Sequence, residues 1–300
     1  MNKITPNLWF DNQAEEAAKF YASLFKDSSV GRITRYTDTG HEVHHQPAGQ
    51  VMTVEFTLAG QPFLALNGGP VFQFTPAISF MVACETVEEV GQLWAELSKD
   101  GQTLMELGEY PFSKKYGWTN DRYGVSWQII HSDQPITQKI TSSLLFVGDK
   151  VGQAEEAVNF YTTVFPDSSV GLIARYEQGE EPNQPGTVKF AGFTLLGQEF
   201  SAMDSALGHD FSFNEAVSLI VECQTQEEID TYWQKLSAVP ESEQCGWLKD
   251  KYGVSWQIVP TVLDELMQSD DTEKVKRVTE AFLGMKKFDI QALKDAAEAK

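Results

Sequence analysis

Apolar and polar residues in the N-terminal part of the chain follow two different periods. In residues 50–58 apolar side chains stand at every second position from Met52 to Leu58, which is typical of a half-buried strand. In residues 14–25 they recur every three or four positions, which indicates an amphipathic helix. With the shorter apolar runs around them, the pattern predicts a strand, a helix and three strands over residues 4–10, 14–25, 31–36, 50–58 and 62–67.

The same order of elements recurs directly afterwards. Residues 77–84 are expected to form an apolar strand and residues 86–98 a helix with one apolar face. Three strands are expected over residues 103–107, 112–119 and 125–131. The chain therefore predicts a second β-α-β-β-β module, and the fold class is α+β.

A long internal repeat organises the rest of the chain. Residues 14–36 match residues 154–176 at 15 of 23 positions without a gap, and GWTNDRYGVSWQI (117–129) matches GWLKDKYGVSWQI (246–258). The repeat predicts two copies of one domain, residues 1–135 and 136–262, with four modules in all, although the second copy lacks about ten residues before its Gly-Trp. Residues 263–300 form a tail.

The tail has a helical pattern of its own. Acidic residues at 270–273 suit the start of a helix, because they complement the positive end of its dipole. Val275, Val278, Phe282 and Met285 form one apolar stripe, and a further short helix is expected from residue 288. These helices are expected to pack on the body, and docking of a partner is the alternative.

Charge and cysteine content narrow the classes of function. The 300 residues carry 43 acidic against 23 basic side chains, a net charge of −20 that repels nucleic acids and suits solubility or a cationic small molecule. Three cysteines do not make a disulfide framework. Apolar runs are too short to span a membrane and no secretion signal is evident, so a cytoplasmic protein is expected.

Residues 41–45 read HEVHH and spell the H-E-x-x-H pattern of zinc proteases. Such a site needs both histidines on one face in the middle of a helix. Here glycine and proline flank the motif between two strands, and the second copy has no histidine at this place. A solvent-exposed loop is therefore expected, with adventitious surface metal binding and a proteolytic site as the alternatives.

Several motifs carry a resemblance to a known family. They are LWFD (8–11), AEEA (14–17), FTLAGQPFLALNGGP (56–70), PAISFMV (76–82) and CGWLKDKYGVSWQIVP (245–260). With the paired modules they resemble the vicinal oxygen chelate superfamily, which includes glyoxalases and bleomycin-resistance proteins. The motifs most resemble those of its PhnB-like family, also named 3-demethylubiquinone-9 3-methyltransferase. The resemblance implies that each module pair curls into a ligand-binding cup.

The resemblance also implies where a metal would be bound. Metal-using relatives place histidines and carboxylates at positions that fall here near Pro6, Ala65, Ile78 and Gln128, and in the second copy near Ser142, Ala202, Val217 and Gln257. None of these is a histidine or a carboxylate, so no metal centre of the family type and no cofactor are expected. The glycine-rich strand-to-helix turn of common methyltransferases is not found either.

Strand alternation from these positions predicts which side chains line the cups. Trp127, Trp256 and Trp9 are then expected in the core. The candidates for ligand binding are Leu8, Phe10, Phe63, Ala65, Asn67, Ile78, Phe80, Ser126, Gln128, Leu144, Phe200, Ala202, Asp204, Val217, Leu219, Ser255 and Gln257.

Other polar residues have a structural and a functional interpretation. Asp121 and Asp250 precede Tyr-Gly in the closing hairpin and are expected to cap its turn. Cys84 and Cys223 are expected to be buried thiols, and Cys245 is a weak nucleophile candidate. Glu55 lies on a strand opposite Gly192 of the other copy. It faces solvent or is a lone carboxylate in a cup that could act as a base.

These features favour a protein that binds a small organic ligand in an apolar cup without a metal centre. An enzyme of the superfamily, such as a lyase, isomerase or dioxygenase, is the alternative, and it needs an unrecognised metal or carboxylate base. An interaction protein that docks through its tail is the third possibility. The fused copies predict either a monomer with an internal pseudo-dimer or a homodimer.

Overall fold

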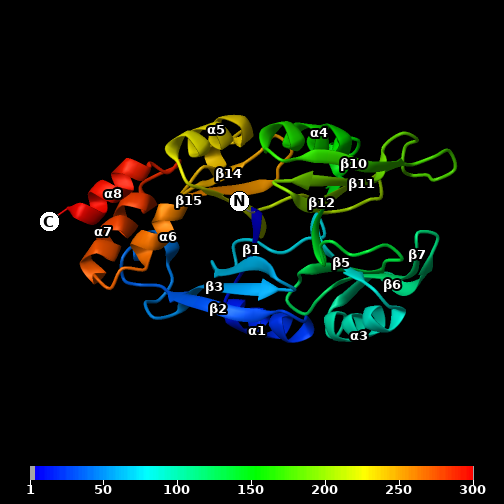
Figure 1. Ribbon diagram of the computed structural model, residues 1–300, viewed down its shortest axis with the longest axis horizontal. Helices are drawn as coiled ribbons and strands as arrows, with labels where there is room; N and C mark the ends of the chain where they lie inside the picture. Colours follow the sequence, from blue (N-terminus) through cyan, green and yellow to red (C-terminus); the bar gives the residue numbers. More distant parts are fainter. Residues whose placement is uncertain (1–3, 300) are drawn as a thin grey trace.

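The computed structural model describes residues 4–299 (Figure 1). In the first copy, the first module contains β1 (Ile4–Phe10), α1 (Ala14–Leu24), β2 (Ser29–Arg35), the short α2 (His41–His44), β3 (Val51–Leu58) and β4 (Gln61–Asn67). The second module contains β5 (Ile78–Cys84), α3 (Val87–Leu97), β6 (Gln102–Tyr110), β7 (Ser113–Asn120) and β8 (Ser126–His131). The α+β fold and the two predicted modules are confirmed.

The second copy repeats this order with one strand fewer. Its elements are β9 (Ile140–Val147), η1 (Gly148–Lys150), α4 (Ala154–Val164), β10 (Ser169–Arg175), β11 (Val188–Leu195), β12 (Gln198–Ser205), β13 (Val217–Cys223), α5 (Gln226–Leu236), η2 (Pro240–Ser242), β14 (Trp247–Lys249) and β15 (Ser255–Pro260). The tail forms α6 (Thr261–Met267), α7 (Thr272–Leu283) and α8 (Ile290–Glu298). The sequence pattern did not predict α6.

The strands form two sheets, and each sheet combines both copies. Sheet A has the order β14-β15-β13-β1-β4-β3-β2, and sheet B has the order β10-β11-β12-β9-β5-β8-β7-β6. The copies meet where β1 pairs with β13 and β5 with β9, both antiparallel. The expectation that the two modules of one copy share a cup is therefore wrong, because each sheet joins the first module of one copy to the second module of the other.

The helices α1, α3, α4 and α5 cover the outward faces of the sheets (Figure 1). The helix α1 packs on β2, β3 and β4, and α3 packs on β5, β7 and β8. The opposite face of each sheet, where the parts contributed by the two copies face each other, is called the inner face. Under α1, the ring of Tyr21 stacks on Phe56 and lies 5.2 Å from the Trp127 ring, so the aromatic core of the first copy links its two modules.

The closing hairpin of each copy is held by a buried aspartate. The carboxylate of Asp121 accepts hydrogen bonds from the backbone N–H groups of Tyr123 and Val125, at 2.8 and 3.1 Å. It also accepts from the Tyr21 hydroxyl at 2.6 Å and from the Trp127 indole at 2.9 Å. The expected turn cap is therefore present, and it also anchors α1. Burial raises the pKa of Asp121, against the lowering effect of these four donors.

The tail takes the place of the strand that the second copy lacks. Beside β14, the backbone N–H of Cys245 donates to the carbonyl of Met285 at 2.8 Å, and that of Gly246 donates to Lys286 at 2.7 Å. Phe288 is 2% exposed and packs so closely on Gly246 that a Cβ there would lie 2.3 Å from its ring. The tail therefore packs on the body. Among residues 4–299, no helix is long and apolar enough to cross a membrane.

Candidate functional site

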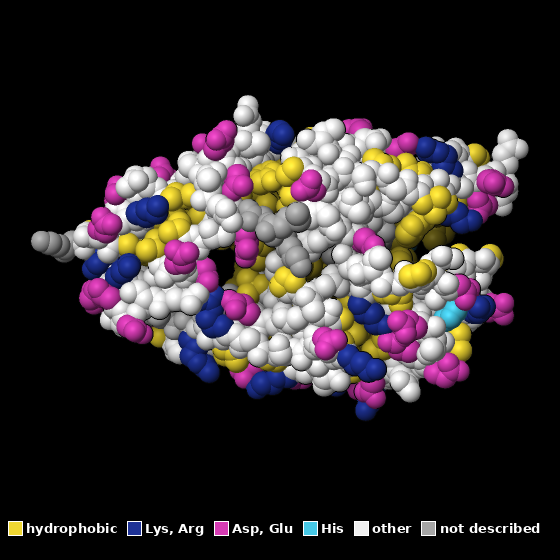
Figure 2. All heavy atoms as spheres, viewed as in Figure 1, with side chains coloured by type: hydrophobic (Ala, Val, Ile, Leu, Met, Phe, Trp, Pro, Cys, Tyr) yellow, Lys and Arg dark blue, Asp and Glu magenta, His cyan; other side chains and the backbone are white. Residues whose placement is uncertain are grey.

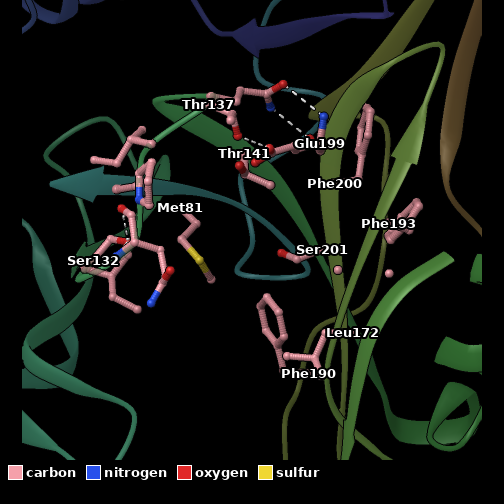
Figure 3. A pocket seen from close by; sticks show the side chains of 18 of the residues that line it. Met81, Ser132, Thr137, Thr141, Leu172, Phe190, Phe193, Glu199, Phe200 and Ser201 are labelled. Carbon is pink, nitrogen blue, oxygen red and sulfur yellow. Dashed lines mark hydrogen bonds between the residues drawn. The ribbon is translucent and has the colours of Figure 1, made fainter. Parts of the chain in front are cut away.

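A cavity of about 640 Å³ opens on the inner face of sheet B (Figure 3). One wall consists of β10, β11 and β12 of the second copy, and the other of β5, the end of β8 and the connection 131–138. Phe112 and Leu172 lie at its walls and are 57% and 70% exposed. In the space-filling view, hydrophobic atoms gather in the notch between the two halves of the molecule on the right (Figure 2).

Strand register determines which side chains reach this cavity. Met81 lies opposite Thr141 across the β5–β9 pair, and Ser201 lies opposite Gly192 across β11–β12. Because residues on one face of a strand alternate, Ile130 shares the inner face with its neighbours at positions i ± 2. The labelled lining residues of Figure 3 include Met81, Thr141, Leu172, Phe190, Glu199 and Ser201.

A chain of hydrogen bonds crosses the inner face beside the cavity. The amide of Gln128 donates to the Ser79 hydroxyl at 2.8 Å and accepts from the Tyr116 hydroxyl at 2.7 Å. Gln128 is 1% exposed, and burial raises the pKa of Tyr116 well above its usual range. All groups in this chain are neutral, so the chain orients hydroxyl groups and places no charge at the sheet centre.

Two buried serines extend this row of polar side chains, which is called the polar strip, and their hydroxyls have no hydrogen-bond partner among the described residues. Ser143 of β9 lies in register with Ser79 on one side and with Ser201 on the other. The side-chain oxygens of Ser143 and Ser201 are buried and form no hydrogen bond among the described residues. A buried polar group without a partner costs free energy, and of the two serines Ser201 lines the cavity, so its hydroxyl is available to a ligand group.

Four of the predicted lining residues lie on the inner faces. Ser126 and Gln128 are on that of sheet B, where the Ser126 hydroxyl accepts from the Trp118 indole at 2.8 Å. Ser255 and Gln257 are on that of sheet A, and the Gln257 amide donates to Ser218 at 2.9 Å. Trp127 and Trp256 are fully buried on the helix-covered faces, as predicted.

The other thirteen predicted lining residues lie on the helix-covered faces, and twelve of them do not line the cavity. Asn67 shows this directly, because its side-chain oxygen accepts from the backbone N–H of Ala14 at the start of α1. Asp204 accepts from Ala154 in the second copy. The twelve misassigned residues are Leu8, Phe10, Phe63, Ala65, Asn67, Ile78, Phe80, Leu144, Ala202, Asp204, Val217 and Leu219. The thirteenth, Phe200, is part of the cavity wall.

Trp9 was misassigned in the opposite sense. It lies on the inner face of sheet A, where its ring is 5.9 Å from that of Trp247 and 5.1 Å from that of Phe72. The physical reason is that the central strands are apolar on both faces, so alternation alone does not reveal which face the helices cover. The serines at 79, 143 and 201 were the available signal, since polar residues are unusual in such strands.

The inner face of sheet A carries charges and is bridged by the tail. Arg32 of β2 forms ion pairs with Glu55 of β3 and with Asp264 of α6. The side chain of Glu55 is 45% exposed, so Glu55 is not the isolated, desolvated carboxylate that could serve as a base. Burial raises the pKa of Glu222, and the nearby Asp264 and Glu55 raise it further.

The HEVHH segment does not assemble a metal site. The expected loop contains a single helical turn, α2, which ends at His44, whereas Gly40 and His45 adopt positive φ on either side. His44 is used locally, because its Nδ1 accepts from the backbone N–H of Gln46 at 3.0 Å. Within residues 4–299, no three His, Cys, Asp or Glu side chains are grouped so that they could hold a metal ion.

The inner face of sheet B also does not suit the metal that the resemblance to metal-using relatives implies. The side chains at the sheet centres are Ser79, Gln128, Ser143 and Ser201 in sheet B, all neutral. Divalent metals in proteins are bound by imidazole, thiolate or several oxygen anions. The residues present therefore do not fit such a metal ion.

The cysteines show no sign of activation. Cys84 and Cys223 are buried, as predicted, and burial raises the pKa of each thiol to about 12. Cys245 is half-buried beside the tail and its pKa is raised to about 11, also by burial. A thiol reacts as its thiolate, so Cys245 is a poor nucleophile.

Comparisons with known proteins agree with this architecture. A family model described as 3-demethylubiquinone-9 3-methyltransferase matches residues 2–130 and again residues 138–259. The chain belongs to this family. Its two matches show the tandem form, and the predicted family is confirmed.

Two solved structures illustrate the likeness. A PhnB protein from Bacillus cereus is 47% identical and covers 43% of this chain and 99% of its own, with a TM-score of 0.40. Glyoxalase I from Zea mays is 11% identical and covers 90% of this chain and 98% of its own, with a TM-score of 0.53. The second likeness shows the fold, with two glyoxalase-like domains. None of the curated proteins compared matches the chain.

Proposed function

We propose that this family member binds a small organic ligand in the cavity on the inner face of sheet B, without a metal centre. The volume of about 640 Å³ lies within the usual range for small-molecule sites, which are mostly apolar with a few placed polar groups. Met81, Leu172 and Phe190 supply apolar surface, and Ser201 supplies a polar group. Although the family name refers to a methyltransferase, the proposal includes no methyl transfer, because this sequence lacks the glycine-rich strand-to-helix turn of common methyltransferases.

The unpartnered hydroxyl of Ser201 carries the proposal. This side chain is 1% exposed, lines the cavity and forms no hydrogen bond to another described residue. A ligand carbonyl, hydroxyl or amine at this place would satisfy a group that is otherwise costly to bury. Binding would therefore gain both apolar burial and a hydrogen bond.

Differences between the copies favour sheet B over sheet A as the place where the proposed ligand binds. Where sheet B has Leu172 and Gly192, sheet A has Arg32 and Glu55, joined in an ion pair. The tail reaches over this pair through Asp264. In sheet A, the charged side chains and the tail therefore occupy the space that is open in sheet B.

A single chain completes both sheets, which supports a monomer as the functional unit. Two glutamines reinforce the contact between the copies. The amide of Gln61 donates to the carbonyl of Ile140 at 2.8 Å and accepts from its N–H at 2.9 Å. Gln198 makes the corresponding pair of contacts with Ile4. The internal pseudo-dimer thus supplies what a second subunit would otherwise provide.

Blocking the cavity with Gly192→Leu tests the proposal. A Cβ at Gly192 meets only the Phe190 ring, at 3.7 Å, and the backbone there does not have positive φ. The new side chain therefore fits the strand and enters the cavity. Gly208→Leu is the matched control, since Gly208 is exposed and a Cβ there meets nothing within 4 Å.

The readout is the fluorescence of Nile red, a neutral apolar dye, titrated with each protein. We expect saturable binding to the unmodified chain and to Gly208→Leu, with affinity reduced at least about tenfold in Gly192→Leu, because a filled cavity removes most of the buried apolar area. Unfolding midpoints of the three proteins are measured alongside. Equal affinity in folded Gly192→Leu, or no binding to the unmodified chain, contradicts the proposal.

A further inference from the structure

We infer that the cavity on the inner face of sheet B selects organic cations, that is, ligands whose flat apolar body carries one positive charge, over anions of the same shape. This inference rests on the proposed function and names its ligand class. It depends on one carboxylate, Glu199, and on the charges around it.

In the part of the chain that the structure describes, the side chains that line the cavity include acids but no strong base. Asp133 and Glu199 are acidic, His131 is the one further titratable group, and neither lysine nor arginine is among the lining residues. An anion placed here would be desolvated without a cation to pair with, which is unfavourable. The net charge of −20 acts in the same direction at longer range.

Glu199 lies on the cavity wall near the start of β12. It shares the inner face with Ser201, two residues further along the strand, and Figure 3 shows it beside Thr137 at the edge of the cavity. Its backbone is fixed by Gln138, whose side chain accepts from the Glu199 N–H at 2.9 Å and donates to its carbonyl at 2.8 Å. The backbone that carries the carboxylate is therefore fixed before any ligand binds.

Among the described residues, the carboxylate of Glu199 has only a neutral partner. It accepts a hydrogen bond from the Thr137 hydroxyl, and none of the ion pairs between described residues includes it. Asp133, across the cavity, is already paired with Lys114. A half-buried carboxylate with no cation beside it in residues 4–299 is thus available to a ligand cation.

Aromatic side chains reinforce the preference. Phe190 and Phe112 line the same cavity, and the negative face of an aromatic ring attracts a cation within about 6 Å. The first copy has Pro62 where the second has Glu199, so this carboxylate is not part of the common domain plan. Glu199 lies on the inner face of sheet B, which carries the open cavity, whereas the tail covers the inner face of sheet A.

Three naphthalene derivatives of similar size test the inference by isothermal titration calorimetry. They are 1-naphthylmethylamine, a cation at neutral pH, 1-naphthylmethanol, which is neutral, and 1-naphthoate, an anion. We expect the cation to bind about fivefold more tightly than the alcohol and the anion about fivefold more weakly, as for a partly exposed ion pair. Glu199→Gln should reduce the advantage of the cation to within about twofold while leaving the affinity for the alcohol unchanged.

Glu241→Gln is the control variant, because it removes one negative charge at an exposed position that does not line the cavity. It should retain the preference for the cation. Raising the salt concentration should also weaken binding of the cation to the unmodified chain more than binding of the alcohol. This measurement does not depend on the folding of a variant. Unchanged alcohol binding shows that Glu199→Gln keeps an intact cavity.

The possible failures are distinguishable. If all three compounds bind equally, or if the preference for the cation survives Glu199→Gln or high salt, the inference is wrong and the proposed small-molecule site stands. If the anion binds most tightly, the inference is wrong as well. If none of the three binds at millimolar concentration, the proposed function itself fails.

Discussion

The buried carboxylate of Asp121 is expected to be a major determinant of stability, and Asp121→Asn tests this. Its oxygens accept four hydrogen bonds, two at each oxygen: Oδ1 from the backbone of Tyr123 and Val125, and Oδ2 from Tyr21 and Trp127. An asparagine amide has nearly the same shape but carries one oxygen and one NH₂ group. Whichever way it is turned, its NH₂ group faces two donors.

The expected loss follows from these contacts. With the NH₂ group on the side of Tyr21 and Trp127, the tyrosine hydroxyl can rotate and accept, but the indole N–H is left without a partner. With the opposite orientation, two backbone N–H groups lose their acceptor. One buried unsatisfied donor and the loss of charge-assisted bonds together cost about 2–4 kcal/mol in the free energy of unfolding.

Urea unfolding followed by tryptophan fluorescence and circular dichroism measures this loss. Asp250→Asn provides an internal replicate, because Asp250 accepts the same four bonds, from Tyr252 and Val254 and from the side chains of Tyr161 and Trp256. If the copies unfold in separate transitions, each variant should shift mainly the transition of its own copy.

Asp149→Asn is the control, since the Asp149 side chain is 83% exposed and should tolerate the change within about 0.5 kcal/mol. The reasoning is refuted if Asp121→Asn has the same midpoint and slope as the unmodified chain. It is also refuted if Asp149→Asn costs as much, because burial and hydrogen bonding would then not be the cause.

Two further variants test the tail and the polar strip. Phe288→Ala should lower the free energy of unfolding by about 3–5 kcal/mol, because it leaves a cavity beside Gly246, and unfolding in urea checks this against Phe112→Ala, which removes a largely exposed ring and should cost under about 1 kcal/mol. Gln128→Leu should cost about 1–3 kcal/mol, since it leaves Tyr116 and Ser79 without the amide that joins them. A cost below about 0.5 kcal/mol for Gln128→Leu, measured by thermal unfolding, would show that water replaces the amide.

Much of the architecture could be predicted from the sequence alone. The period of apolar residues placed β1, α1 and most other elements of the first copy within a few residues of their observed bounds, because local backbone preference and burial of one face act over short distances. The repeat gave four modules, and the position of Asp121 two residues before Tyr123 predicted its role in the turn. These features depend on neighbours in the chain.

The candidate site depended on tertiary structure. The central strands, such as β5, are apolar on both faces, so the sequence could not show that Phe80 packs toward Trp127 while Met81 faces the cavity. Nor does any local pattern specify that β1 pairs with β13, more than two hundred residues away, rather than within its own copy. The covered face of each central strand and the pairing between the copies both depend on how all four modules are buried together, and only the assembled fold defines this.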